Sequence, residues 1–248
     1  MSDLEFSGLA TPLTDADIVA AASRWQVEPA LIRAVDEVES AGLGFLPDGR
    51  PKILFERHIF HRRTGGRYSV TYPSISNVMP GGYGPAGAYQ HDRLHMAIAL
   101  DRDAALQSAS WGRFQIMGFN YAACGFVTVE TFVATICESE ARHLEAFFAF
   151  CRTNDLLRHL IEHDWRAFTR GYNGPGNVDY YSQRLAEAYH KHVATATPPP
   201  DDPIVAQQKA VQRALVAAGY DIGQAGADGW PGKDTLAAMR AYRKKRGV

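Results

Sequence analysis

The chain has 248 residues, of which 46% are hydrophobic and 21% charged, and its formal net charge is −1, a balance typical of a soluble globular protein. No apolar run approaches the roughly 18 residues of a membrane span, and the acidic N-terminus lacks the basic-then-apolar pattern of a signal peptide, so we expect synthesis in the cytoplasm. The three scattered cysteines, Cys124, Cys137 and Cys151, exclude a disulfide framework and are expected to be reduced core residues.

Residues 1–193 are predicted to form one mainly helical domain, and its first two helices have recognisable ends. Thr14 is a suitable N-cap for the first of them, because its side chain can accept a hydrogen bond from the opening turn. Pro29 suits the first position of a second helix and Gly42 the position just past its end.

The rest of this domain alternates between helical and irregular patterns. Residues 44–95 are rich in Gly and Pro, with β-prone pieces such as KILFERHIF, which predicts a long loop with a hairpin. In a helical domain, a loop of this length is more often functional than idle. One long amphipathic helix is expected over residues 128–152, and another over residues 180–193.

A proline-rich linker is predicted over residues 194–203, ATATPPPDDP, because consecutive prolines favour an extended, unpacked segment. Beyond it, residues 204–248 hold eight Lys or Arg against three Asp, a charge of +5, whereas the remaining residues carry −6. An acidic body with a basic end suggests two domains with different roles.

Glu39 is the most informative residue of the second helix. At about 100° per residue, it lies only about 40° from Val35 and about 20° from Ile32 around the helix axis, on the apolar side. A carboxyl group in apolar surroundings holds its proton to higher pH, which suits a general acid that protonates a leaving oxygen. The alternative is a helix-end Glu that turns out to water.

Four stretches in chain order resemble known sugar-cleaving enzymes. ALIRAVDEVES, SASWGRFQIM (residues 108–117) and RGYNGPG (residues 170–176) resemble motifs of the goose-type lysozyme and lytic transglycosylase superfamily. Together with GFLPDGRPKILFERHIFHRRTGG, they resemble more closely the phage-type N-acetylmuramidase family. The resemblance covers residues 10–193 and implies a lysozyme-like helical fold with a groove for the glycan of peptidoglycan.

The resemblance also implies roles for individual residues. Glu39 would be the general acid, and Ser40, which follows it, would bind or orient locally. Gln115 would hydrogen-bond the substrate in the groove, and Tyr172 and Asn173 would lie near the catalytic Glu. Without the resemblance, these four would be read as polar residues at helix ends and in turns.

Hydrolysis of a glycoside usually requires a second carboxylate. Glu56, in ILFERHIF, is the best candidate, with a salt-bridged structural Glu as the alternative. Asp48 is another candidate, although Asp-Gly is ordinary turn chemistry. A lytic transglycosylase needs no second carboxylate, because a hydroxyl group of the sugar itself attacks.

The histidines offer a different enzyme class. HDRLH places His91 and His95 four residues apart beside Asp92, and a helix would bring both imidazoles to one side, as in zinc peptidases. His58 and His61 would be further ligands. A zinc peptidase or amidase is therefore an alternative, although no third-ligand pattern follows HDRLH.

Residues 204–248 read as helix, Gly/Asp-rich turn and helix. They resemble a small three-helix peptidoglycan-binding domain at Gln212, Leu215, Gly219, Tyr220, Asp228, Gly229, Gly232, Thr235 and Ala238. The basic end, RAYRKKRGV, would attract an anionic wall polymer or is simply a solvated helix end. We expect no nucleic-acid binding, because no aromatic platform accompanies the short basic cluster.

The combined expectation is an endolysin-like peptidoglycan hydrolase. As an N-acetylmuramidase, it would cleave the β-1,4 bond between N-acetylmuramic acid and N-acetylglucosamine by general acid catalysis, as a monomer without a cofactor. It would reach the cell wall from the cytoplasm by release or injection. The alternatives are a lytic transglycosylase that forms 1,6-anhydro products, the zinc enzyme, and a non-catalytic wall-binding protein.

Overall fold

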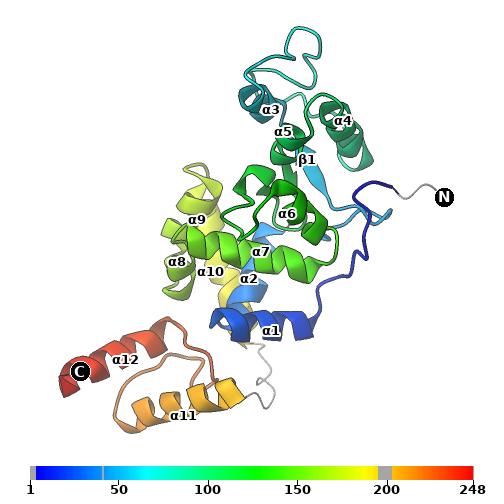
Figure 1. Ribbon diagram of the computed structural model, residues 1–248. Coiled ribbons are helices and arrows are strands. Elements are labelled where there is room, and N and C mark those ends of the chain that lie inside the picture. Colours follow the sequence, from blue (N-terminus) through cyan, green and yellow to red (C-terminus); the bar gives the residue numbers. More distant parts are fainter. Residues whose placement is uncertain (1–3, 41, 195–202, 248) are drawn as a thin grey trace. The chain divides into compact units, whose positions relative to one another are not determined.

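The structure, a computed structural model, describes residues 4–40, 42–194 and 203–247. It is mainly helical, as predicted, with one small sheet (Figure 1). Its internal contacts divide the chain into two units, one of residues 1–13 and 40–154 and the other of residues 14–39 and 155–248. Within the described ranges, no helix combines the length and the apolar character that a membrane crossing requires.

The first unit contains a three-stranded antiparallel sheet and short helices. Its strands follow the order β1 (Ile53–Phe55), β2 (Ala109–Trp111) and β3 (Ile116–Met117). Leu54 pairs with Ser110, and Trp111 pairs with Ile116. The helices are α3 (Arg57–Arg63), α4 (Ala88–Ile98), α5 (Arg102–Gln107), the 3-10 helix η1 (Gly118–Asn120), α6 (Val129–Ile136) and α7 (Glu140–Thr153).

Among the described residues of the second unit, the regular elements are all helices, joined by turns and loops. Its helices are α1 (Asp15–Trp25), α2 (Pro29–Glu39), α8 (Leu157–Ile161), α9 (Trp165–Asn173), α10 (Val178–Ala194), α11 (Pro203–Ala217) and α12 (Lys233–Arg246). Helix α10 packs along α2 and α9, as the yellow and blue ribbons in Figure 1 show. This packing buries the apolar side of α2, where Ile32 and Val35 are completely inaccessible to solvent.

The predicted helix starts agree with the structure. Thr14 caps α1 in a reciprocal capping box with Asp17, whose carboxylate accepts a hydrogen bond from the Thr14 backbone. Pro29 is the first residue of α2. The helix ends at Glu39, three residues before Gly42, which has a left-handed φ of 82°.

The prediction of one long helix over residues 128–152 is wrong, because the chain forms α6 and α7 with a break at residues 137–139. Ser139 caps α7 by accepting a hydrogen bond from the backbone of Arg142. Glu140, which is 2% exposed, accepts a hydrogen bond from the backbone of Leu13 and forms an ion pair with Arg113. These long-range contacts favour two helices over a continuous one.

The loop expected over residues 44–95 contains more regular structure than predicted. It includes β1, all of α3 and the start of α4. The expected hairpin within it does not form, because β1 pairs with the distant β2. Residues 64–87 do form the long irregular segment, which projects beyond α3 and α4 (Figure 1).

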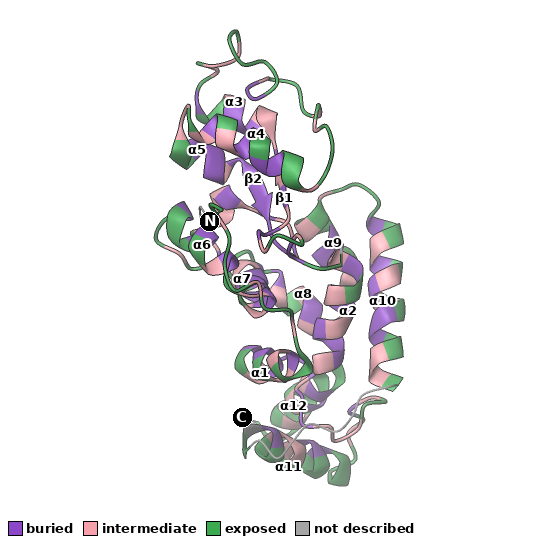
Figure 2. Ribbon diagram, turned by 90° about the vertical axis from the view of Figure 1, so that its right-hand side faces the viewer, coloured by how far each residue is buried: buried purple, intermediate pink, exposed green. Residues whose placement is uncertain are grey.

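The core of the first unit is rich in aromatic residues, and the sheet is part of it. Strand β2 is buried along its whole length (Figure 2), and Phe55 and Phe147 are fully buried. The three cysteines, Cys124, Cys137 and Cys151, are free thiols in this core, as predicted.

The C-terminal residues 203–247 form α11 and α12, joined by a turn-rich connection, whereas the resemblance implied three helices. Their small core consists of Leu215, Ile222 and Ala238. Of the predicted linker, Ala194 ends α10 and Pro203 begins α11, and residues 195–202 lie outside the described residues.

Candidate active site

Glu39 is the last residue of α2, and its carboxylate meets the end of α9. The side-chain amide of Asn173 donates to both carboxylate oxygens, Oε1 and Oε2, each at 3.2 Å. Asn173 is itself the last residue of α9, so two helix ends bring these side chains together within the second unit. Gly174, with a φ of 83°, ends α9 directly after Asn173.

The surroundings of Glu39 favour its protonated form. Burial raises the pKa of Glu39 above its ordinary value, and the hydrogen bond from Asn173 and the charge of Arg184 lower it in part. The pKa stays raised because loss of solvation outweighs both. The carboxyl group therefore combines a raised pKa with a fixed orientation, and both suit a general acid.

Glu56 lies in the first unit, between the end of β1 and the start of α3. Its Oε1 accepts a hydrogen bond of 3.2 Å from the hydroxyl of Tyr83. Its Oε2 lies 3.1 Å from Nδ1 of His58, within ion-pair distance, although the two atoms are not in hydrogen-bond geometry. Glu56 is thus a half-buried carboxylate with polar neighbours.

Gln115 lies at the opposite end of β1 from Glu56 and is already engaged by the protein. Its side-chain oxygen accepts a hydrogen bond from Ser110 at 2.8 Å, and its amide donates to the carbonyls of Lys52 at 3.2 Å and Gly112 at 2.7 Å. This amide closes the turn between β2 and β3, and the residue has a left-handed φ of 49°.

The other predicted residues have simpler surroundings. Ser40 directly follows α2 and is partly exposed. Tyr172, in the last turn of α9, stacks on Phe168 with ring centroids 5.4 Å apart. Asp48 holds Arg50 through its side chain at 2.7 Å, and this contact lowers the pKa of Asp48, as expected of a turn-stabilising residue.

The histidines of HDRLH point to separate partners. His91 is buried, and its Nε2 lies 2.9 Å from the carbonyl oxygen of Pro51. His95 lies 3.4 Å from Glu5. Among the described residues, no three His, Cys, Asp or Glu side chains form a group that would hold a metal ion, so the zinc alternative finds no donor set there.

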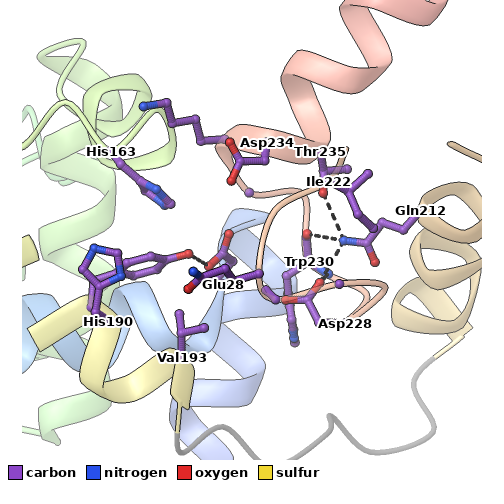
Figure 3. Close-up of a pocket in the computed structure, with 16 residues that line it drawn as sticks. Glu28, His163, His190, Val193, Gln212, Ile222, Asp228, Trp230, Asp234 and Thr235 are labelled. Carbon is purple, nitrogen blue, oxygen red and sulfur yellow. Dashed lines mark hydrogen bonds between the residues drawn. The ribbon is translucent and has the colours of Figure 1, made fainter. Parts of the chain in front are cut away.

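A cavity of about 170 Å³ lies within the second unit (Figure 3). Tyr189 donates a hydrogen bond to Glu28 at its edge. Burial raises the pKa of Glu28 to about 7, with a further contribution from Asp228. None of the predicted site residues is among the described residues that line this cavity, so it is separate from the candidate active site.

Two neighbours of the candidate carboxylates escape sequence reasoning. Arg184, in α10, acts on the charge of Glu39, and Tyr83 bonds Glu56. Tyr83 had one available signal, its place between glycines in PGGYGP. Glycines on both sides of a residue indicate a sharp bend of the backbone there. Arg184 had none, since an arginine in an amphipathic helix is ordinary.

Comparisons with known proteins identify the family of this chain. The crystal structure of Burkholderia AP3 phage endolysin is similar to this chain, with 42% sequence identity, a TM-score of 0.70, and coverage of 75% of this chain and 72% of that one. No curated protein matches the sequence. A family model described as N-acetylmuramidase matches residues 28–193, and the chain therefore belongs to the N-acetylmuramidase family.

Proposed function

We propose that this muramidase cleaves the β-1,4 bond between N-acetylmuramic acid and N-acetylglucosamine in peptidoglycan, with Glu39 as the general acid. The observation that carries the proposal is the carboxyl group of Glu39, whose pKa burial raises and which Asn173 holds in place. Its proton would pass to the glycosidic oxygen, so that the leaving sugar departs as a neutral alcohol.

Glu56 is proposed as the second carboxylate. It would accept a proton from a water molecule while the water oxygen bonds to the anomeric carbon, so that one water is added across the broken bond. Its half-buried position and its polar neighbours Tyr83 and His58 support this role. Asp48 is a weaker candidate, because its carboxylate is committed to Arg50.

The alternative chemistry is a lytic transglycosylase that uses Glu39 alone. In that reaction the 6-hydroxyl of muramic acid attacks the anomeric carbon, and the product carries an internal 1,6-anhydro ring. The two reactions share the general acid, so a Glu39 variant does not separate them. The masses of the products do, because the anhydro fragment is lighter by one water.

The first experiment is a digestion of purified peptidoglycan by the wild type and by Glu39→Gln, with the soluble fragments weighed by mass spectrometry. We expect fragments that end in reducing muramic acid, and a loss of at least about 100-fold in rate for Glu39→Gln, the order expected for removal of a general acid. Unchanged lysis by Glu39→Gln would remove Glu39 from the mechanism.

Glu37→Gln is the matched control for that variant. It makes the same chemical change two residues away in α2, where the Glu37 carboxylate is half-exposed and paired with Lys191 and His192. We expect its lytic rate to stay near that of the wild type. If the wild type releases anhydro fragments instead, the enzyme is a lytic transglycosylase and not a hydrolase.

Residues 204–248 are proposed as a wall-binding domain that keeps the catalytic residues near an insoluble substrate. Tethering of this kind raises the effective concentration of glycan at the active site. The exposed cations of α12, Arg243, Lys244, Lys245 and Arg246, would add long-range attraction to anionic wall polymers. Replacing all four with Gln is expected to lower retention on intact walls but not the rate on soluble glycan chains.

An endolysin-like role completes the proposal. The similar AP3 protein is a phage endolysin, and a chain of this kind would act on the wall from the inside after release, or after injection by a secretion machine. Lysis of cells that express the chain, only when a pore-forming protein is supplied with it, would support this role. Lysis without such a protein would contradict it.

A further inference from the structure

The backbone of Glu56 is fixed, but its carboxylate is not held by the helix that it begins. Its backbone N–H donates to the carbonyl of Ser108 at 2.9 Å, and its own carbonyl accepts from the amides of Ile59 and Phe60 at 3.0 and 3.1 Å. Glu56 occupies the N-cap position of α3, yet its side chain makes no capping hydrogen bond. The direction of the carboxylate therefore depends on other side chains.

Tyr83 supplies the hydrogen bond that the carboxylate receives. In the described part of the chain, its hydroxyl is the donor to Oε1, whereas the buried Oε2 accepts no hydrogen bond. The proximity of Glu56 and burial both raise the pKa of Tyr83, which keeps the phenol protonated and able to donate. One carboxylate oxygen is thus anchored by a hydrogen bond, and the other lies within ion-pair distance of His58.

The segment that carries Tyr83 is built for this placement. Gly82 and Gly84, on either side of it, have left-handed φ values of 67° and 68°. A Cβ at Gly82 would lie 2.6 Å from the guanidinium of Arg57, and one at Gly84 would lie 2.4 Å from the ring of Tyr89. Glycine suits both positions, because it adopts a left-handed φ readily and has no Cβ to meet these side chains. The backbone can therefore bend tightly on each side of the tyrosine.

Gln90 ties this segment to β1, the strand that directly precedes Glu56. This side chain of α4 is 1% exposed. Its amide donates to the carbonyl of Tyr83 at 2.7 Å, and its oxygen accepts from the backbone N–H of Phe55 at 3.2 Å. Arg93 reinforces the link by donating to the carbonyl of Phe55 at 2.9 Å. The backbones of Tyr83 and of Phe55, which directly precedes Glu56, are therefore held to one buried amide.

We propose that Tyr83 is a positioning residue, whose hydroxyl fixes the orientation of the Glu56 carboxylate for its role as the base. This inference rests on the proposed function, because it assigns Tyr83 a role only if Glu56 is the second carboxylate. The hydroxyl holds Oε1, while Oε2 lies 3.1 Å from Nδ1 of His58. Losing the hydroxyl would let the carboxylate rotate without changing the fold around it.

The test begins with Tyr83→Phe, which removes one oxygen and keeps the ring. We expect kcat on soluble glycan chains to fall about tenfold, the order for a lost hydrogen bond to a charged group, while KM changes less than about twofold. Tyr68→Phe is the matched control, because the Tyr68 hydroxyl donates to the carbonyl of Leu100 at 2.8 Å, away from Glu56. Its kcat should stay near wild type.

A double variant separates positioning from a general structural role. In the background of Glu56→Gln, Tyr83→Phe should cause no further loss of kcat, because there is no longer a base to orient. A further tenfold loss in the double variant would show that Tyr83 acts in another way, and would overturn the inference.

The two single variants distinguish this inference from the proposal beneath it. If Glu56→Gln is inactive and Tyr83→Phe retains full kcat, the role of Glu56 stands and that of Tyr83 is wrong. If Glu56→Gln retains full kcat, the proposed role of Glu56 fails, and the positioning role fails with it. Thermal unfolding of each variant checks that the fold is intact.

Discussion

Asn173 donates one side-chain amide to both oxygens of Glu39, each at 3.2 Å, across 134 residues of sequence. The contact joins the last residues of two helices, so it depends on where α2 and α9 end. It also opposes the effect of burial, because a hydrogen bond to a carboxylate stabilises the ionised form. Asn173 thus orients the carboxyl group and limits how far its pKa is raised.

Replacing Asn173 with Ala is expected to lower kcat and to extend activity to higher pH. Without the amide, the pKa of Glu39 rises further, so the general acid stays protonated longer and the alkaline limb of the pH–rate profile moves upward. We expect kcat at the optimum to fall about tenfold. Asn154→Ala, which removes an amide at the end of α7, is the control. An alkaline limb that stays in place would contradict the contact.

Glu28 is expected to make folding stability depend on pH. Its pKa rises from 4.5 to about 7 on folding, and the residue is 6% exposed. The folded state therefore binds the proton more tightly, so stability is highest below pH 4.5 and falls as pH rises to about 7. The loss amounts to about 3 kcal/mol.

Glu28→Gln removes this dependence, so its unfolding free energy should match the wild type at pH 5 and exceed it at pH 8. Urea denaturation at both pH values measures the difference. Glu37→Gln is the control, since ion pairing lowers the pKa of Glu37 and its loss should destabilise at pH 8. If the unfolding free energy changes equally between pH 5 and pH 8 in the wild type and in Glu28→Gln, Glu28 is not buried as described.

Glu140 is expected to be one of the most sensitive residues for folding. Replacing it with Ala removes the partner of Arg113 and the acceptor for the backbone amide of Leu13. Breaking a buried ion pair from one side costs about 4 kcal/mol, measured as the free energy of unfolding in urea. Glu138→Ala breaks an exposed pair with Arg142 and should cost less than about 1 kcal/mol. Equal losses for both would contradict this assignment.

Gln115→Ala distinguishes a turn-stabilising role from a substrate contact. Because the side chain makes three hydrogen bonds within the protein, we expect the free energy of unfolding to fall by about 2 kcal/mol, with little change in KM. Gln107→Ala, on the surface of α5, should change neither. Unchanged stability with a raised KM would instead support the groove role that the family resemblance implies.

Local rules were sufficient for several elements of this fold. The N-cap at Thr14 and the helix start at Pro29 depend on neighbouring residues only, so both can be recognised in the sequence. The same holds for the apolar side of α2, because helical periodicity fixes it whatever packs there. Glu39 was therefore identified as a carboxyl group on the apolar side of α2 without any tertiary information.

Long-range contacts account for the errors and omissions. The break before α7 is stabilised by Glu140 and its distant partners, which a reading of hydrophobic periodicity cannot include. The pairing of β1 with β2 spans more than 50 residues, so the expected local hairpin was wrong. Tyr83 and Glu56 are likewise separated by 27 residues, and only the bend at the glycines brings them together.

The buried thiols have a consequence for the proposed passage of the protein from the cytoplasm to the cell wall. Burial raises the pKa of Cys124 and of Cys137 to about 12, and Cys151 is completely inaccessible to solvent. Oxidation and disulfide exchange proceed through an accessible thiolate, which none of the three provides in the folded state. The folded chain would therefore keep the same covalent form on either side of a bacterial inner membrane, and would need no oxidoreductase to become active.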